Sequence, residues 1–158
     1  YIRTLCVDIG RKLGCGAHLL ELRRTKIGCL NLENAVKLQD LKDAYMIWIE
    51  DENDRELKEI INPFEKLFDH LPKIVVRDSA VDALCHGADL ALPGVLEVDS
   101  DIRKNDLIAI FTLKNEIIAL GKALMDAEQI IQKDKGFCAN IERVFMKRGT
   151  YPRVWKKS

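Results

Sequence analysis

A change of pattern at Leu71-Pro72 constrains the fold of this 158-residue chain more than any other feature. Upstream of it, apolar residues recur every three or four positions, which is the spacing of helices that bury one face. Downstream of it, short apolar runs are separated by turn residues, which is the pattern of short strands. The sequence therefore predicts an α+β protein of two units, an α/β piece at residues 1–71 and a mostly β module at residues 72–158.

The first unit opens with a clear helical pattern. A helix is expected to end at Gly14, and its apolar residues share one face: Ile2, Leu5, Cys6, Ile9 and Leu13. A loosely alternating stretch at residues 18–24 and an apolar stretch at residues 27–30 predict a pair of strands. Further helices are expected at residues 38–50, at residues 57–61 and from Pro63, which the first turn of a helix tolerates.

The second unit contains six apolar runs of strand length. They are residues 73–76, 90–92, 95–98, 107–113, 117–123 and 138–145. Two helical segments interrupt them, at residues 79–85 and 127–132, and Lys114-Asn115-Glu116 has the composition of a hairpin turn. Six short strands in about 80 residues favour a small, partly closed mixed β-barrel.

The charges balance overall but are distributed unevenly. The chain has 25 basic and 25 acidic residues, and its formal net charge is zero. Residues 1–30 carry six basic groups against two acidic ones, whereas residues 31–71 carry five against eleven. From Arg143 to the end there are six basic residues and no acidic one. Both ends are therefore candidate surfaces for a polyanion, and the middle is not.

Several classes of protein are disfavoured. No apolar run approaches the roughly 18–20 residues of a membrane span, and no signal-peptide pattern opens the chain. The five cysteines are an odd number, are widely spaced and include no C-x-x-C pair. This pattern indicates a reduced, intracellular protein. The chain begins at Tyr1 within a helical pattern and without a methionine, so we expect a fragment of a longer protein.

Two motifs have both a functional and a structural interpretation. Gly10, Gly14 and Gly16 invite comparison with a phosphate-binding loop, but a helix precedes them where a strand is needed, which favours a helix cap and a tight turn. A cysteine-histidine set could supply zinc ligands or a nucleophile pair: Cys15, His18, Cys85 and His86. Because the last two are adjacent and their side chains diverge, buried cysteines acting as small hydrophobic residues are favoured.

Basic and aromatic residues near the end of the chain suit single-stranded RNA. Tyr151 and Trp155 could stack on bases while the neighbouring cations bind phosphates; these cations are Arg143, Lys147, Arg148 and Arg153. The alternative is that the charges are solvated and the aromatic rings belong to the core. Arg3 borders an apolar helix face, so it either pairs with a carboxylate or phosphate or extends from the surface into solvent.

Two blocks of residues closely resemble the TruB/dyskerin family of pseudouridine synthases. Residues 1–10 (YIRTLCVDIG) and 13–24 (LGCGAHLLELRR) resemble late motifs of the catalytic domain of that family. Five further motifs resemble the PUA domain that follows in dyskerin-type members: residues 78–81, 86–90, 93–95, 121–123 and 144–146. The blocks occur in the order of the family and cover nearly the whole chain. The compact end resembles an archaeal member, with a cytoplasmic location.

The resemblance implies the isomerisation of uridine to pseudouridine in rRNA or tRNA, without a cofactor. In the family a catalytic aspartate attacks the flipped-out nucleoside, the glycosidic bond breaks, and the base is rejoined through carbon. That aspartate belongs to an upstream block that is not among these residues, so the isolated fragment is expected to be inactive. Arg3 matches the arginine that pairs with the aspartate, and Leu22 matches the apolar residue that packs near the target base.

The resemblance also implies how RNA is bound. The PUA domain of dyskerin-type members binds the ACA trinucleotide of box H/ACA guide RNAs, and in related enzymes it binds tRNA. Residues that match the glycine-centred loop are Gly87, Ala88, Asp89 and Leu90. Charge and position add Arg77, Arg148 and Tyr151 as candidate RNA-binding residues. The family works with small H/ACA core proteins, one of them zinc-ribbon-like, and we expect no metal in this chain itself and no membrane partner.

A second interpretation belongs to a different class. The chain contains the motifs of a PUA domain but not the nucleophile, so it could serve as a non-catalytic RNA-binding or assembly module. A purely structural protein without RNA contact would require the basic end to be inert.

Overall fold

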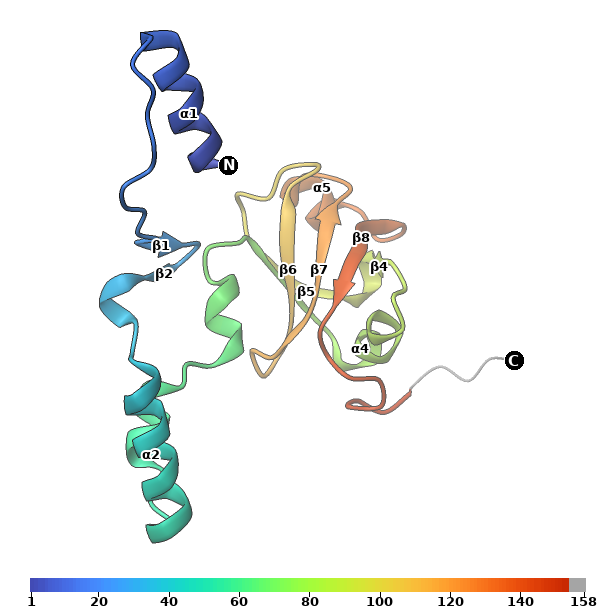
Figure 1. Cartoon of the computed structure of the whole chain (residues 1–158). Coiled ribbons are helices and arrows are strands. Elements are labelled where there is room, and N and C mark those ends of the chain that lie inside the picture. Colours follow the sequence, from blue (N-terminus) through green and yellow to red (C-terminus); the bar gives the residue numbers. More distant parts are fainter. Residues whose placement is uncertain (154–158) are drawn as a thin grey trace.

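Residues before Pro72 form helices and very short strands beside a barrel-like sheet that the later residues build (Figure 1). The computed structural model describes residues 1–153. Within this part of the chain, no helix is long and apolar enough to cross a membrane.

Helix α1 (Ile2–Leu13) has the predicted bounds and is followed by Gly14. Gly14 has a φ of 71°, the left-handed conformation that ends many helices and that glycine adopts without strain. The chain then turns back on the helix. A Cβ atom on Gly10 would overlap the backbone of Gly16 and Ala17. The predicted cap and tight turn are confirmed, and the close approach of the returning chain explains the glycine at position 10.

The strand pair expected at residues 18–30 is only partly correct. Two short antiparallel strands, β1 (Lys26–Ile27) and β2 (Leu30–Asn31), flank a turn at Gly28-Cys29. Residues 18–24 contain no regular secondary structure. Alternation predicts a strand only where the backbone finds a ladder partner, and no strand of the described chain pairs with these residues.

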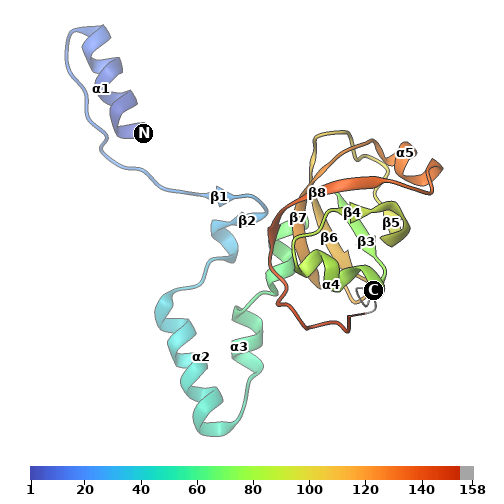
Figure 2. The ribbon, with the colours of Figure 1, turned by 90° about the vertical axis from the view of Figure 1, so that its right-hand side faces the viewer.

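A helical hairpin and two short 3-10 turns complete this part of the chain. Helices α2 (Leu38–Asp51) and α3 (Arg55–Ile60) lie side by side at some distance from α1 (Figure 2). The polar turn between them contains Glu52 in the left-handed conformation, with a φ of 54°. The 3-10 turn η1 (Leu32–Asn34) precedes the hairpin and η2 (Phe64–Phe68) follows it. The predicted helices are confirmed, with the last one in 3-10 form.

The later residues form one six-stranded sheet in the order β4-β8-β7-β6-β3-β5. The strands are β3 (Lys73–Val76), β4 (Leu90–Ala91), β5 (Val95–Val98), β6 (Leu107–Thr112), β7 (Ile117–Ala123) and β8 (Phe137–Val144). Neighbouring strands are antiparallel except β3 and β6, which run parallel. Two helices, α4 (Asp78–Cys85) and α5 (Ala127–Gln132), and the 3-10 turn η3 (Leu92–Gly94) lie between them. The mixed, nearly closed sheet confirms the predicted barrel-like module.

Strand β6 is central because both of its faces are covered. Ile108 and Ile110 point into the main core, which also contains residues of α4, β7 and β8. Ala109 and Phe111, on the opposite face, belong to a second cluster with Phe68 of η2. A strand buried on both faces is apolar on both, which is why residues 107–111 show no alternation. The second cluster attaches the end of the first segment to the barrel.

Candidate nucleic-acid interface

A cavity of 330 Å³ lies beside α4, and we call it the α4 cavity. Its lining comes from the helix and from the segment that leads into β5: Ser79, Ala80, Ala83, Leu84, Asp89, Leu90, Ala91, Pro93 and Gly94. Most of these side chains are small or apolar, so the wall is largely apolar. A cavity of this size with few polar groups suits a flat, partly apolar ligand such as a base.

The turn after α4 shapes one side of this cavity. The N–H of Gly87 donates a hydrogen bond to the carbonyl of Leu84 (2.9 Å), and the N–H of Ala88 donates one to the carbonyl of Ala83 (3.1 Å). Gly87 has a φ of 82°, which an L side chain rarely adopts. Leu90 is buried in the main core, whereas Gly87 and Ala88 are exposed. The structure therefore brings Asp89 and Leu90 of the predicted loop to the cavity wall and places Gly87 and Ala88 at the preceding turn.

Asp89 is half-buried and is held in place by a strand that lies far from it in the sequence. Its Oδ1 atom accepts hydrogen bonds from the Asn140 side-chain amide (2.9 Å) and from the Ile141 backbone N–H (3.1 Å). Asn140 lies on β8. Sequence reasoning missed this residue, because nothing in the pattern of β8 indicates a contact 51 positions away.

Arg77 lies next to the α4 cavity. Its backbone N–H donates a hydrogen bond to the carbonyl of Gly94 (2.8 Å), a residue of the cavity lining. The Arg77 side chain is exposed and forms no ion pair with any residue from 1 to 153. On α4, Asp82 has basic neighbours, with Arg153 at 3.9 Å and His86 at 3.7 Å. The C-terminal segment, residues 146–153, therefore reaches α4.

Tyr151 does not lie on the surface as a stacking residue should. Its side chain is buried in the main core, and its hydroxyl donates a hydrogen bond of 2.7 Å to Oε2 of Glu116. The proposed base-stacking role is incompatible with this placement, because a buried ring has no free face. Arg148 is exposed in the same segment, and its contact with phosphate stays a prediction. Trp155, the second aromatic candidate, lies outside the described residues.

The pKa values of Glu116 and Tyr151 shift in opposite directions. Hydrogen bonds from Tyr151 and then from Thr112 hold the pKa of Glu116 below its ordinary value. The hydrogen bond to Glu116 raises the pKa of Tyr151. Lys114 lies over the Tyr151 ring, 5.6 Å from its centroid. Together these contacts hold the C-terminal segment on the β6–β7 hairpin.

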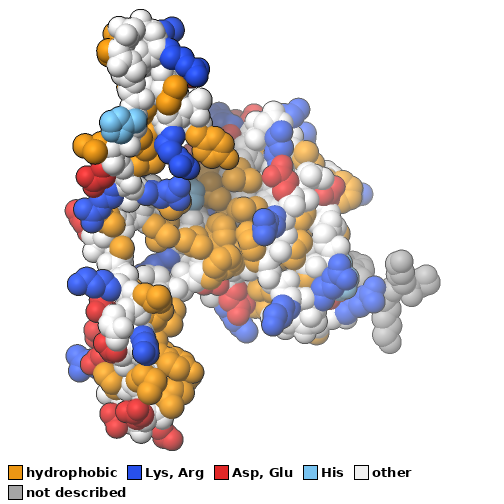
Figure 3. Space-filling model, in the orientation of Figure 1, with side chains coloured by type: hydrophobic (Ala, Val, Ile, Leu, Met, Phe, Trp, Pro, Cys, Tyr) orange, Lys and Arg blue, Asp and Glu red, His pale blue; other side chains and the backbone are white. Residues whose placement is uncertain are grey.

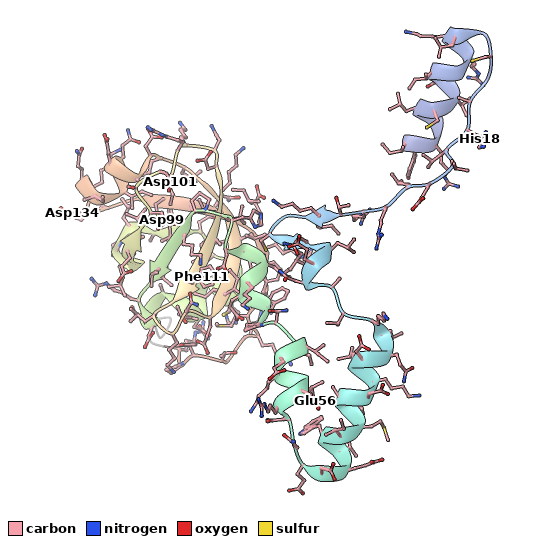
Figure 4. The ribbon with its side chains drawn as sticks, turned by 90° about the vertical axis from the view of Figure 1, so that its left-hand side faces the viewer. His18, Glu56, Asp99, Asp101, Phe111 and Asp134 are labelled. Carbon is pink, nitrogen blue, oxygen red and sulfur yellow. The ribbon has the colours of Figure 1, made fainter. Side chains whose placement is uncertain are left out.

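The buried cysteines behave as hydrophobic residues. Cys85 and Cys138 both belong to the main core. Burial raises the pKa of the Cys85 thiol, and it raises that of Cys138 to about 11, so both are protonated near neutral pH and are poor nucleophiles. Cys15 and His18 are exposed, and Figure 4 shows His18 far from the barrel. Within residues 1–153, no three His, Cys, Asp or Glu side chains are placed to hold a metal ion.

The segment from α1 to β1, which contains Arg3 and Leu22, lies far from α4 (Figures 1 and 2). Both side chains are exposed, and Figures 1 and 2 place the helix that carries Arg3 and the helix α4 in distant parts of the molecule. The apolar face of α1 is itself exposed, so Arg3 borders no core here, and it has no ion-pair partner in the described chain. The structure does not bring the predicted catalytic residues and the predicted RNA-binding residues together.

Two family models match consecutive parts of the chain. Residues 3–69 match the tRNA pseudouridylate synthase B C-terminal domain, and residues 72–145 match the PUA domain. The fold and these matches define a two-part protein in which a TruB C-terminal domain is joined to a PUA domain.

Relatives at high identity carry the same parts. The chain is 54% identical over 158 residues to the probable tRNA pseudouridine synthase B of Archaeoglobus fulgidus, covering 100% of this chain and 49% of the relative. It is 52% identical over 157 residues to the protein of the same name from Methanocaldococcus jannaschii, covering 99% and 47%. The chain thus carries a TruB C-terminal domain and a PUA domain like those relatives, and it spans about half the length of the curated relatives it matches.

Solved structures agree with this assignment. The chain is similar to a protein in the archaeal box H/ACA sRNP Nop10-Cbf5 complex, with a TM-score of 0.83 and 47% identity over 98% of this chain and 50% of that one. It is also similar, with a TM-score of 0.82 and 47% identity, to a chain of an H/ACA RNP bound to a substrate RNA containing 2′-deoxyuridine, covering 98% of this chain and 49% of that one.

Proposed function

We propose that these residues are the RNA-binding C-terminal part of an archaeal, dyskerin-type pseudouridine synthase, and that the two units divide at Leu71-Pro72. The α4 cavity is the observation that carries the proposal. It lies at the loop matching the family motif, it has the small apolar lining that suits a base, and the exposed Arg77 stands next to it. The ligand that we propose is the ACA end of a box H/ACA guide RNA.

We further propose roles for the first unit in catalysis by the whole protein. Arg3 would pair with the nucleophilic aspartate and Leu22 would pack near the target uridine, with no cofactor involved. Both side chains are exposed, so they are free to contact a neighbouring catalytic surface. The reaction would isomerise uridine in rRNA or tRNA. Because the nucleophile is proposed to lie outside the present sequence, the 158-residue chain with guide and substrate RNA should form no detectable pseudouridine.

The proposed partners follow from the structural relatives. One solved relative is a Nop10-Cbf5 complex and another is a Cbf5-Nop10-Gar1 complex. Small H/ACA core proteins are therefore proposed partners of the protein, together with guide and target RNA. All five cysteines are free, which supports a reducing, cytoplasmic location.

The experiment that tests the RNA assignment compares two short single strands, one ending in ACA and one with a scrambled end. Binding to the 158-residue chain is measured at low and at moderate salt. We expect a preference for ACA that survives added salt, because base recognition depends less on counterion release than phosphate contact does. Equal binding that collapses with salt would contradict the proposal and would indicate only a basic surface.

A blocked cavity provides the matched control. Ala83 is exposed and lines the cavity, so Ala83→Phe should fill it without disturbing the core and should abolish the preference for ACA. Gln132→Phe places the same ring on α5, at an exposed position outside the cavity lining, and should leave the preference intact.

A non-catalytic RNA-binding module is the second candidate function. One observation favours it: the α4 cavity is built entirely by residues after Pro72, whereas helix α1, which carries Arg3, lies in a distant part of the molecule (Figure 1). Both functions predict that the chain binds ACA and forms no pseudouridine, even under conditions in which a full-length relative is active. Loss of activity in that full-length protein on replacing the arginine that matches Arg3 would favour the enzyme.

A further inference from the structure

The wall of the α4 cavity that contains Asp89 is held in place by β8. Oδ1 of Asp89 accepts two hydrogen bonds from that strand, at 2.9 Å from the Asn140 amide and at 3.1 Å from the Ile141 N–H. The Ile141 bond uses the backbone and is available to any residue except proline at that position. The Asn140 bond depends on the side chain, so Asn140 is the part of this arrangement that the sequence can vary.

The backbone around Asp89 is weakly fixed by itself. Strand β4 has only two residues, lies at the edge of the sheet and contains a register shift between Leu90 and Ala91. On the other side, Gly87 allows a wide range of backbone conformations. A short edge strand after a glycine has few ladder bonds to restrain it, so the two hydrogen bonds to Asp89 carry much of the orientation of this wall.

The other carboxylate oxygen of Asp89 is free for a ligand. Oδ2 accepts no hydrogen bond from any residue between 1 and 153, and Asp89 lines the cavity. An ionised carboxylate repels phosphate and accepts hydrogen bonds from N–H groups. Adenine and cytosine present an exocyclic amino group for such a bond, whereas uracil presents a carbonyl oxygen at the corresponding position.

We propose that Asn140 is a positioning residue that orients Asp89, so that the free carboxylate oxygen selects a base bearing an exocyclic amino group in the α4 cavity. This inference rests on the proposed function, since it assumes that RNA enters the cavity. Asn140 itself is exposed and lies outside the cavity lining, so it acts through Asp89.

The test measures binding of the 158-residue chain to an RNA ending in ACA and to a uridine-only RNA of equal length. Asn140→Leu removes the amide without adding charge, and we expect it to weaken ACA binding roughly tenfold, the usual effect of losing a hydrogen bond to a charged group. Affinity for the uridine-only RNA and the salt dependence should not change, because no phosphate contact is lost. Gln132→Leu, which removes an exposed amide from α5, is the control and should bind as the wild type does.

A double-mutant cycle shows whether the effect passes through Asp89. In an Asp89→Asn background, Asn140→Leu should have much less than its tenfold effect, because the carboxylate that it orients is gone. Equal effects in both backgrounds would overturn the assignment. Hydrogen exchange without RNA is the independent readout: the amides of Leu90 and Ile141 should exchange faster in Asn140→Leu than in the wild type.

Failure of the proposed function and failure of the role of Asn140 give different results in this test. A wild-type chain that binds both RNAs equally would overturn the proposed function and base selection by Asp89 together. A wild type that prefers ACA, with an Asn140→Leu variant that is unchanged or equally weakened toward both RNAs, would overturn the role of Asn140 alone.

Discussion

The segment before Pro72 and the barrel after it differ in how much of their apolar surface they bury. Among the hydrophobic residues of positions 1–153, only Ala44 and Phe68 are buried before Pro72, whereas the barrel contains a continuous core. The apolar face of α1 is exposed, with Leu5 at 54% and Leu13 at 72% of their accessible surface. The space-filling view shows apolar side chains gathered along this segment and on the facing side of the barrel (Figure 3).

The difference shows that an amphipathic pattern and a buried core are separate properties. The helices before Pro72 form because their local sequences favour helices, and α2 is also capped, since Asp40 accepts a hydrogen bond from the backbone N–H of Lys37. The barrel strands form because residues far apart in the chain exclude water together. Local structure alone gives little free energy, so we expect the first segment to open far more readily than the barrel.

The largest expected effect tests this contrast directly. Ile118 is fully buried in β7, and Ile118→Ala should lower the free energy of unfolding of the barrel by about 2–5 kcal/mol. Leu5→Ala on α1 removes an exposed side chain and should change it by no more than about 0.5 kcal/mol. Denaturant unfolding, followed by a signal from the barrel, measures both. Comparable losses in the two variants would show that the first segment has a stabilising core of its own.

Two glycines sharpen the comparison, because each is in close contact with backbone. A Cβ atom on Gly121 would lie 2.8 Å from the carbonyl oxygen of Asn140, so Gly121→Ala should destabilise the barrel by roughly 1–3 kcal/mol. Gly10→Ala should displace residues 14–17 from α1 without changing the unfolding midpoint of the barrel. Hydrogen exchange resolves the two effects by position. A shift of the barrel midpoint in Gly10→Ala would refute the independence of the regions.

The contact between Tyr151 and Glu116 should have a smaller effect that depends on pH. Tyr151→Phe removes a hydrogen bond to a carboxylate and should destabilise the barrel by about 1–2 kcal/mol near neutral pH. The pKa of Glu116 is lowered in the folded protein, so its contribution is present above its unfolded-state pKa and is lost as the pH falls through the folded value. The stability difference between wild type and Tyr151→Phe should therefore shrink in acid.

Ionisation of Tyr151 makes the same contact depend on pH in the opposite direction, at high pH. Its pKa is raised, so the stabilisation is complete below the unfolded-state pKa of about 10 and disappears as the pH rises through the folded value. Unfolding of both proteins across the pH range tests both signs. A stability difference between the two proteins that is constant from acid to alkali would contradict a hydrogen bond between the neutral Tyr151 hydroxyl and the ionised Glu116 carboxylate.

The smallest effect concerns one cation in each region. Arg148 and Arg3 are both exposed, but only Arg148 belongs to the C-terminal segment that reaches α4. Arg148→Ala should reduce the slope of log affinity against log salt by about one, as expected for one lost phosphate contact, and Arg3→Ala should not change it. RNA binding by the 158-residue chain at several salt concentrations gives both slopes. An effect of Arg3→Ala equal to that of Arg148→Ala would place RNA on both regions.

The sequence by itself determined the elements whose signals are local. The face of α1, its end at Gly14, the hairpin turn at Lys114-Asn115-Glu116 and the positions of the barrel strands follow from periodicity and turn chemistry within a few residues. The glycine-centred loop was also visible in the sequence, because a glycine such as Gly87 ends a helix whatever lies around it in the fold.

Only the tertiary structure decided features that depend on a distant partner. Residues 18–24 alternate as a strand does, but without a pairing partner they have no ladder. Tyr151 is an aromatic residue of the kind that stacks on bases, yet its ring is buried in the main core and its hydroxyl donates a hydrogen bond to Glu116. The contact of Asn140 with Asp89 joins residues 51 positions apart. Hydrogen bonds and burial act between neighbours in space, and a single sequence does not state which residues become neighbours.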